Sequence, residues 1–230
     1  MRGPRPHLTL EHTVMTLFRL DASINPANSA SHAIADIVES EWAAANPDDT
    51  VVRRDLGTEP LPADAWTGAL RASWTPEAAR TQEQTAAIAL AAGLADEVRS
   101  ADAVLLAVPL YNFGIPQHVK TWIDVVLAGA KSPNEELLAG KPAVLVVVRG
   151  GAYGAGTPRE GWDHSTGYLR RIIADVWGAD LTIVEREFTL VGVNPALDDF
   201  KELAGQFKDA AHAAAAEAGQ ALGARATVAA

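Results

Sequence analysis

Two uninterrupted apolar runs, Ala103–Val108 and Ala143–Val148, constrain the fold of this chain more than any other feature. A strand with one face in solvent alternates apolar and polar residues, whereas a strand covered on both faces is apolar throughout. The two runs therefore predict central strands of a parallel sheet. Three more strands are predicted, at Thr16–Leu20, at Val51–Arg54, and in a final extended segment formed by Leu181–Val184 with Phe188–Val191.

Segments with helical patterns alternate with these strands. We expect helices at Ser31–Ala45, at Pro76–Arg99, from Pro116 to about Ala130, at Tyr168–Trp177, and from Asn194-Pro195 onward. This alternation predicts βαβ units and a three-layer α/β sandwich around a central parallel five-stranded sheet. Asp55–Trp74 carries little periodicity, and no composition break divides residues 15–230, so a single domain is expected.

Composition excludes several classes of function. The formal charge of −10 argues against binding to nucleic acid or to an anionic membrane, because both need clustered Lys and Arg. The chain has no cysteine, which removes disulfides and thiol chemistry. No apolar stretch approaches the ~20 residues of a membrane span. Met1–Val14 has no hydrophobic signal core, so we expect a disordered extension over residues 1–14 and a cytoplasmic protein.

The segment after the first predicted strand has the character of a phosphate site. Ser23–Ser31 supplies hydroxyl groups and leads directly into a helix, whose N-terminal N–H groups favour an anion. The competing interpretation is that Ser29 or Ser31 only caps the helix.

Two further segments follow the two apolar strands. Pro109–Pro116 combines aromatic residues with Asn112 and a glycine, and it can place a platform along a flat ring or form a simple turn with core aromatics. Arg149–Gly156 is rich in glycine, which permits close backbone approach to a ligand or makes a flexible loop. Ligands of such sheets bind beyond the carboxyl ends of the strands. Together the three segments favour flavin mononucleotide (FMN).

Other chemistries lack their patterns. The six histidines show no pairing at metal-ligand spacing, so no metal site is expected. No G-x-S-x-G elbow, G-x-G-x-x-G fingerprint or Walker A motif is present.

The three segments resemble those of the FMN-dependent NADH:azoreductase and NAD(P)H:quinone oxidoreductase family, whose members have a flavodoxin-like fold. Val108–Pro116 carries the most specific resemblance. The resemblance implies a homodimer with sites at the interface and a small-molecule electron acceptor. It also implies that the following residues bind the cofactor: Ser23, Ser29, Ala30, Ser31, Leu110, Tyr111, Asn112, Phe113, Val148, Arg149, Gly150 and Gly151.

Departures from the family pattern concern mainly the substrate side. Lys131–Glu136 is shorter than the corresponding family stretch, which covers the substrate. On the flavin side, Val148 stands where the family often has a serine, in the loop at the pyrimidine side of the ring. Asp175 and Val176 occupy a region where the family often presents an aromatic residue. With Tyr153 and Trp122 they are the candidate pocket residues, although helix packing or a dimer face also explains Trp122.

The sequence therefore predicts an FMN-dependent oxidoreductase. NADH or NADPH would donate hydride, and quinones, azo compounds or related conjugated acceptors would receive it in a ping-pong reaction. The cofactor would carry the chemistry, so no catalytic side chain is assigned. Two alternatives stay open: a tailoring reductase or isomerase for one biosynthetic substrate, and a non-enzymatic FMN-binding electron carrier.

Overall fold

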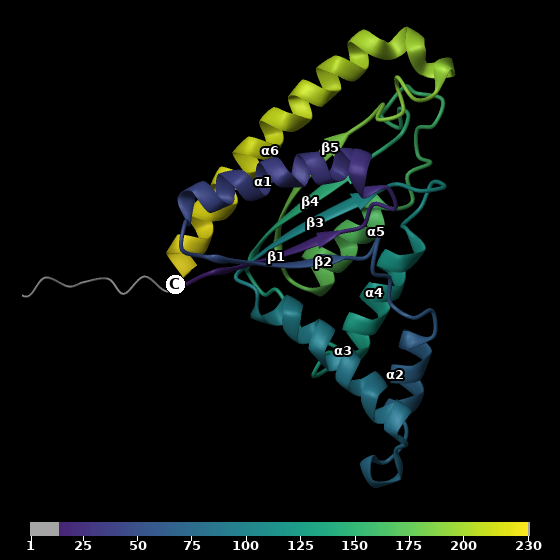
Figure 1. Cartoon of the computed structure of the whole chain (residues 1–230), viewed down its shortest axis with the longest axis vertical. Helices are drawn as coiled ribbons and strands as arrows, with labels where there is room; N and C mark the ends of the chain where they lie inside the picture. The colour runs from purple at the N-terminus through teal and green to yellow at the C-terminus, as the bar shows by residue number, and fades with distance from the viewer. Residues whose placement is uncertain (1–13, 230) are drawn as a thin grey trace, which may run out of the picture.

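The computed structural model describes residues 14–229 and contains one parallel sheet (Figure 1). Its strand order is β2-β1-β3-β4-β5. The strands are β1 (Thr16–Asp21), β2 (Thr50–Asp55), β3 (Ala103–Pro109), β4 (Pro142–Val148) and β5 (Asp180–Arg186). All four pairings are parallel, which confirms the predicted five-stranded α/β sheet. The predicted extension, apart from Val14, lies outside the described residues.

Burial of the strands follows their place in the sheet. Every residue of β3 and β4 is buried, whereas the edge strands β2 and β5 keep many exposed or half-buried positions. Two separate cores result, one on each face of the sheet. The apolar runs that predicted central strands are therefore the strands with helices on both sides.

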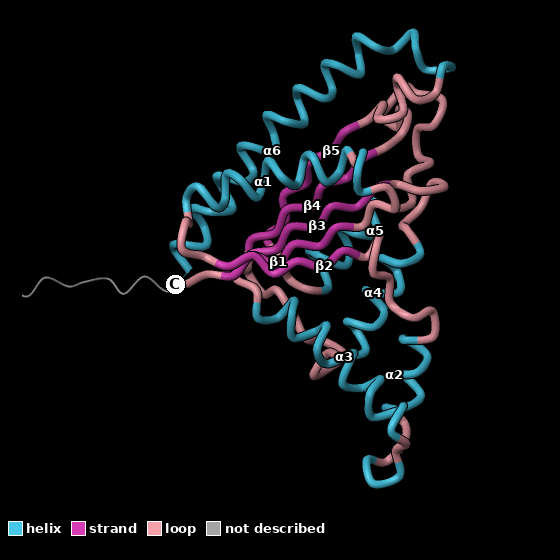
Figure 2. Tube along the Cα trace, viewed as in Figure 1, coloured by secondary structure: helices cyan, strands magenta, loops and turns pink. Residues whose placement is uncertain are grey.

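Helices cover both faces of the sheet (Figure 1). On one face lie α1 (Ala30–Ala45) and α6 (Lys201–Ala229). On the other lie α3 (Gln82–Ser100), α4 (Gln117–Ala128) and α5 (Thr166–Arg170), and α5 continues as a π-helix over Arg171–Val176. The strands run in one direction, so their carboxyl ends open into loops at the same edge (Figure 2). No helix within residues 14–229 is long and apolar enough to cross a membrane.

Several boundaries differ from the sequence predictions. Asp55–Trp74 contains a helix, α2 (Ala65–Ser73), whose buried stripe consists of Ala65, Ala69 and Ala72. Alanine contributes little hydrophobic signal, so its periodicity is weak. The helix predicted from Pro76 begins only at Gln82, because Thr81 and Gln84 form a capping box there.

The last strand and the last helix also differ. The predicted extension of the strand through Phe188–Val191 is wrong, because these residues form turns and Phe188 has a φ of +56°. The Asn194 side chain accepts a hydrogen bond from the Ala196 amide and is a cap, as predicted. It opens a 3-10 helix over Pro195–Phe200, however, and α6 follows at Lys201.

Helices α1 and α6 approach each other closely at Gly219. A Cβ atom at this position would lie 2.5 Å from the carbonyl oxygen of Val38 and 2.7 Å from the Cβ atom of Glu41. At Gly205, in the same helix, a Cβ atom would have no neighbour within 4 Å. The two glycines therefore separate the effect of packing from that of helix propensity.

We predict that Gly219→Ala destabilises the protein by about 1–3 kcal/mol, because the methyl group overpacks the α1–α6 contact. Gly205→Ala should instead stabilise it by about 0.5–1 kcal/mol through higher helix propensity. Urea unfolding of both variants measures the difference. Equal stabilisation by the two substitutions would contradict the close contact.

Candidate functional site

A cavity of about 520 Å³ opens at the carboxyl edge of the sheet. All three predicted segments contribute to its lining: Ile24 from the first, Leu110–Phe113 from the second, and Gly150, Gly151 and Tyr153 from the third. Ile24 and Tyr153 are 129 residues apart in the chain, and the parallel topology alone brings the segments to one edge. This cavity is the candidate active site.

The loop after β3 has a strained tip that faces the cavity. Asn112 and Phe113 have φ angles of +47° and +67°, in the left-handed region that non-glycine residues rarely occupy. Tyr111 and Gly114 close the turn with two backbone hydrogen bonds, of 2.9 and 3.3 Å. Outside the tip, the His164 amide donates to the Phe113 carbonyl oxygen at 2.9 Å. Backbone strain of this kind is concentrated at functional sites, where it sets the position of a binding loop.

The aromatic side chain of Phe113 is not a core residue. It is 41% exposed and lies edge-on to Trp162, with the ring centroids 5.5 Å apart. Tyr153 is the next ring, at 6.4 Å from Phe113. A turn that only buried two aromatics would hide this ring, so the geometry favours the platform interpretation.

The serines of the first loop have two different surroundings. Ser29 caps α1, since its Oγ accepts a hydrogen bond from the His32 amide at 3.2 Å. It also lies 3.0 Å from the Oγ of Ser31, which is fully buried. Ser23 is nearly buried and accepts from the Asn25 amide at 3.3 Å. Ser29 is therefore a helix cap, as the competing interpretation proposed. Of the amides at the start of α1, only that of His32 donates to its side chain, so the other amides there could still bind an anion.

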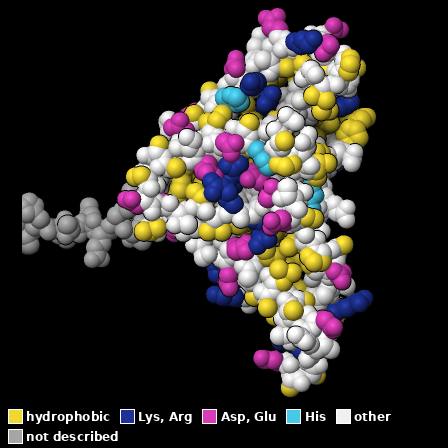
Figure 3. Space-filling model, in the orientation of Figure 1, with side chains coloured by type: hydrophobic (Ala, Val, Ile, Leu, Met, Phe, Trp, Pro, Cys, Tyr) yellow, Lys and Arg dark blue, Asp and Glu magenta, His cyan; other side chains and the backbone are white. Residues whose placement is uncertain are grey.

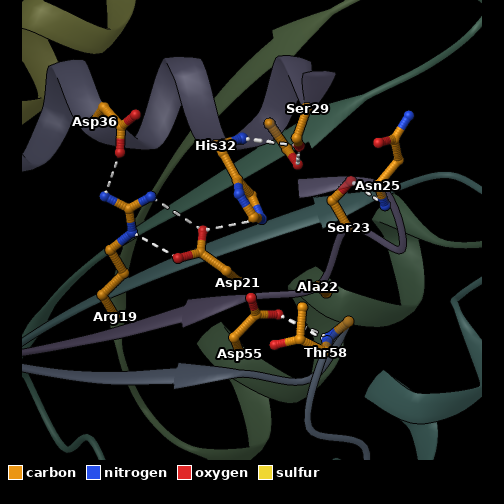
Figure 4. A network of polar contacts seen from close by, with 12 residues as sticks. Arg19, Asp21, Ala22, Ser23, Asn25, Ser29, His32, Asp36, Asp55 and Thr58 are labelled. Carbon is orange, nitrogen blue, oxygen red and sulfur yellow. Dashed lines mark hydrogen bonds and ion pairs between the residues drawn. The ribbon is translucent and has the colours of Figure 1, made fainter. Parts of the chain in front are cut away.

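The first loop rests on a buried ion-pair network (Figure 4). Arg19 is nearly buried in β1 and pairs with Asp21 at 2.9 Å and with Asp36 of α1 at 2.7 Å. Burial opposes the charge of Arg19, but these carboxylates outweigh it and raise the pKa of the guanidinium. Asp21 also lies 3.6 Å from His32. On the face shown in Figure 3, Lys and Arg side chains lie among acidic ones.

The second-strand exit packs directly beneath the first loop. The Leu56 amide donates to the Asp21 carbonyl oxygen at 2.8 Å. A Cβ atom at Gly57 would lie 2.0 Å from the Ser23 carbonyl oxygen, so only glycine fits there. The Ile24 amide in turn donates to the Tyr111 hydroxyl at 3.2 Å, which joins the first loop to the second.

Arg149 supports the third loop from outside the cavity. Its guanidinium is nearly buried and bonds to Asp163 and Glu185, both at 2.7 Å, and to the Thr166 hydroxyl at 3.0 Å. Its amide donates to the Arg186 carbonyl oxygen, and its own carbonyl oxygen accepts from Thr189. Val148 is buried and accepts from the Leu110 amide. Of the predicted Val148–Gly151 group, therefore, only the two glycines line the cavity.

Three predicted pocket residues lie elsewhere. Trp122 is 1% exposed, is stacked on Phe18 and lies edge-on to Trp177, so the pocket assignment is corrected to helix packing. Asp175 and Val176 end the helix that runs back from the cavity. The next residue, Trp177, accepts a hydrogen bond from Leu138, shortly before β4 begins. Asp175 and Val176 are therefore at the amino edge of the sheet, and their assignment to the pocket is wrong within this chain.

The shortened stretch Lys131–Glu136 is also at the amino edge. Glu135 pairs with Arg99 at the end of α3, at 2.6 Å. Hydrogen bonds from Arg99 lower the pKa of the Glu135 carboxyl. Within one chain, this stretch does not border the cavity.

Several residues that no sequence pattern predicted also lie at this edge of the sheet. Arg159, Leu190, Asn194 and Leu197 complete the lining of the cavity. A second cavity, of about 470 Å³, lies beside Pro26–Ala30 and is lined also by Arg186, Lys208 and His212. Burial and the two neighbouring cations lower the pKa of His212. Arg159 lies in the loop between β4 and α5, and the other residues come from β5, α6 and their connection, far along the chain. No local motif marks any of them.

Candidate metal ligands do not gather at the cavity. Within the described part of the chain, no group of three or more His, Asp or Glu side chains is arranged to hold a metal ion.

Comparison with known proteins gives consistent matches over almost the whole chain. A family model described as a flavodoxin-like fold matches residues 15–220. A protein of Frankia alni named FMN-dependent NADH:quinone oxidoreductase is 38% identical over 191 residues, which are 81% of this chain and 90% of the relative. A protein of the same name from Kineococcus radiotolerans is 40% identical over 216 residues, covering 90% and 99% of the two chains.

Solved structures give the same result. The crystal structure of an azoreductase from Bacillus anthracis str. Sterne aligns with a TM-score of 0.74 and 25% identity. The alignment covers 90% of this chain and 100% of that chain. Its coverage leaves no large part of that protein unmatched.

Asp163 gives the loop network a measurable pH dependence. Burial opposes ionisation of this carboxyl, but hydrogen bonds from Thr166 and Ser165 and the Arg149 guanidinium outweigh burial and lower its pKa. A carboxyl with a lowered pKa stabilises the folded state at pH values above its ordinary pKa of about 3.9. This stabilisation is lost as the pH falls through the lowered pKa of the folded state.

We predict that Asp163→Asn lowers the free energy of unfolding by about 1–3 kcal/mol at pH 7, because it breaks a buried charged hydrogen bond. The difference from the original protein should shrink below about pH 4. Asp175→Asn, which breaks the exposed pair with Arg171, is the control and should change stability by less than about 0.5 kcal/mol. A pH-independent loss in Asp163→Asn would contradict the assignment.

Proposed function

This chain belongs to the flavodoxin-like fold family, and on that basis we propose that it is an FMN-dependent oxidoreductase. It transfers hydride from NADH to quinones, azo compounds or related conjugated acceptors. The observation that carries the proposal is the cavity in which the three predicted segments meet. The names of the two relatives, at 38% and 40% identity, and of the B. anthracis azoreductase support it.

The residues of the cavity fit an FMN ring. Phe113 offers an exposed aromatic ring, and Gly150 and Gly151 offer backbone without side chains. A Cβ atom at Gly150 would lie 2.6 Å from Cδ1 of Leu190, so a side chain there would displace Leu190 from the lining of the cavity. A volume of about 520 Å³ is within the ordinary range for a cofactor site.

The phosphate end of FMN would be held by the first loop. Ser23, Ser29, Ala30 and Ser31 surround the start of α1, whose amides favour an anion. The cations Arg186 and Lys208 in the neighbouring cavity add positive potential on this side. No carboxylate within the described residues is in ion-pair distance of either.

When bound, FMN would supply the hydride-transfer chemistry between NADH and the acceptor. The chain supplies position and electrostatics. The amides of Asn112, Gly150 and Gly151 make no hydrogen bond to the described residues, which leaves them available to stabilise negative charge at the ring. Phe113, Tyr153 and Trp162 limit the access of water and offer flat surfaces to conjugated molecules.

We further propose that residues 15–230 form one domain and that the protein is a cytoplasmic homodimer with its sites at the interface. Exposed apolar side chains near the cavity, among them Phe113, Trp162 and Val193, are consistent with a second chain covering it. Light scattering tests the dimer, and a monomer mass would remove the shared site.

The test of the function is an anaerobic absorption spectrum of the protein reconstituted with FMN, recorded before and after addition of NADH. We expect a bound-flavin spectrum that bleaches with NADH and recovers with a simple quinone. A flavin that binds but stays oxidised would support an electron carrier instead. Rapid bleaching with poor turnover of every simple quinone would support a specialised tailoring enzyme.

Asn112→Asp tests the placement of the strained loop. A carboxylate at this position would repel the negative charge of the reduced ring, so we expect weaker FMN binding or slower reduction, by about tenfold. Asn134→Asp adds the same charge in an exposed segment at the other edge of the sheet and is the control. FMN titration and stopped-flow reduction measure the two effects. Unchanged binding and reduction in Asn112→Asp would show that the loop does not face the ring.

A further inference from the structure

Among the described residues that line the candidate active-site cavity, only Arg159 carries a formal charge. The remaining lining is apolar, aromatic, amide or glycine.

Aromatic contacts, and not an acid, hold the Arg159 side chain. Its guanidinium carbon is 6.0 Å from the centroid of Phe113 and 5.7 Å from that of Tyr153. Its Nη1 lies 3.5 Å from the Tyr153 hydroxyl, at the limit of a hydrogen bond. No carboxylate of the described residues is within ion-pair distance, in contrast to Arg19, Arg99 and Arg149. Most of its hydrogen-bond donors therefore remain available to a ligand.

Gly151 fixes where the guanidinium can lie. A Cβ atom at Gly151 would be 3.1 Å from Nη1 of Arg159, so the cation packs over bare backbone at the wall of the cavity. The same glycine lines the space proposed for the flavin ring. A molecule stacked in the cavity would therefore reach the guanidinium with a substituent at its edge.

We infer that Arg159 binds a carboxylate or sulfonate group on a conjugated acceptor, so that the protein prefers anionic aromatic acceptors to neutral ones. This inference rests on the proposed function. The exposed rings of Phe113 and Trp162 complement a planar ring system, and the planar guanidinium matches the two oxygens of an acid group. Lysine would supply the charge without the paired donors.

The first experiment compares 1,4-naphthoquinone-2-sulfonate with 1,4-naphthoquinone as acceptors of the FMN-loaded protein at saturating NADH. In Arg159→Gln, the ratio of kcat/KM for the sulfonate to kcat/KM for the neutral quinone should fall about tenfold or more, the usual effect of losing a charged hydrogen bond. Arg159→Lys should fall in between. Arg53→Gln, which changes an exposed arginine of the edge strand β2, should leave the ratio unchanged.

The second experiment does not depend on turnover. Calorimetry with the FMN-loaded protein compares naphthalene-2-sulfonate with its neutral analogue naphthalene-2-sulfonamide. The original protein should bind the sulfonate more tightly, and Arg159→Gln should abolish the difference. Lack of quinone reduction by the original protein would overturn the proposed function, while this binding difference would still decide the role of Arg159.

Two results would overturn the inference about Arg159. One is an equal loss for the charged and neutral probes in Arg159→Gln. The other is a loss confined to the reduction of the flavin by NADH, which would assign the cation to the phosphates of the donor.

Discussion

The complete burial of β3 and β4 is the constraint on which the rest of this structure depends. A strand covered on both faces has no polar side, so helices must cover both faces of the sheet and each crossover must return the chain to the same end. All strand ends then meet at one edge. Residues as distant in sequence as Ile24, Asn112 and Gly151 become neighbours there without any local signal that pairs them. The sheet topology therefore determines where the cavity lies, and the motifs determine only which residues line it.

Ionic and backbone contacts keep the loops of that edge in place. Arg19 and Arg149 lie near the ends of β1 and β4, and each holds carboxylates from two or more segments. Between them, the Tyr111–Gly114 turn holds two residues with positive φ. Strain of about 1–3 kcal/mol per residue is tolerated only where the surrounding structure overrides it. The two buried arginines therefore stabilise the loops on either side of the strained, exposed platform, and they need not touch a ligand themselves.

The central strands could be predicted from the sequence because their burial produces continuous apolar runs. Apolar runs located the central strands, and the rule for parallel sheets then located the edge at which loops matter. Elements and side chains whose positions depend on contacts between distant segments could not be predicted in this way. The buried face of α2 is made of alanines, which resemble solvent-facing helix residues. The turn at Phe188 is set by its stacking on Phe200, 5.0 Å away, and by a positive φ that no propensity predicts. Trp122 matched a pocket residue by type but faces the core, and Arg159 was missed because an exposed arginine in a loop has no distinguishing pattern.

The position of Arg159 matters more for binding an anionic acceptor than the net charge of the whole chain does. A chain with a formal charge of −10 repels anions at long range, and that repulsion is screened beyond about 8 Å at physiological ionic strength. At the cavity, the guanidinium of Arg159 lies much closer to a bound molecule than most charges of the chain do, so it interacts with that molecule more strongly. Net charge therefore governs how fast an anionic acceptor arrives, whereas the local cation governs how long it stays. An acidic protein can in this way select an anionic aromatic molecule, provided that the cation lies inside the cavity and has no acidic partner of its own.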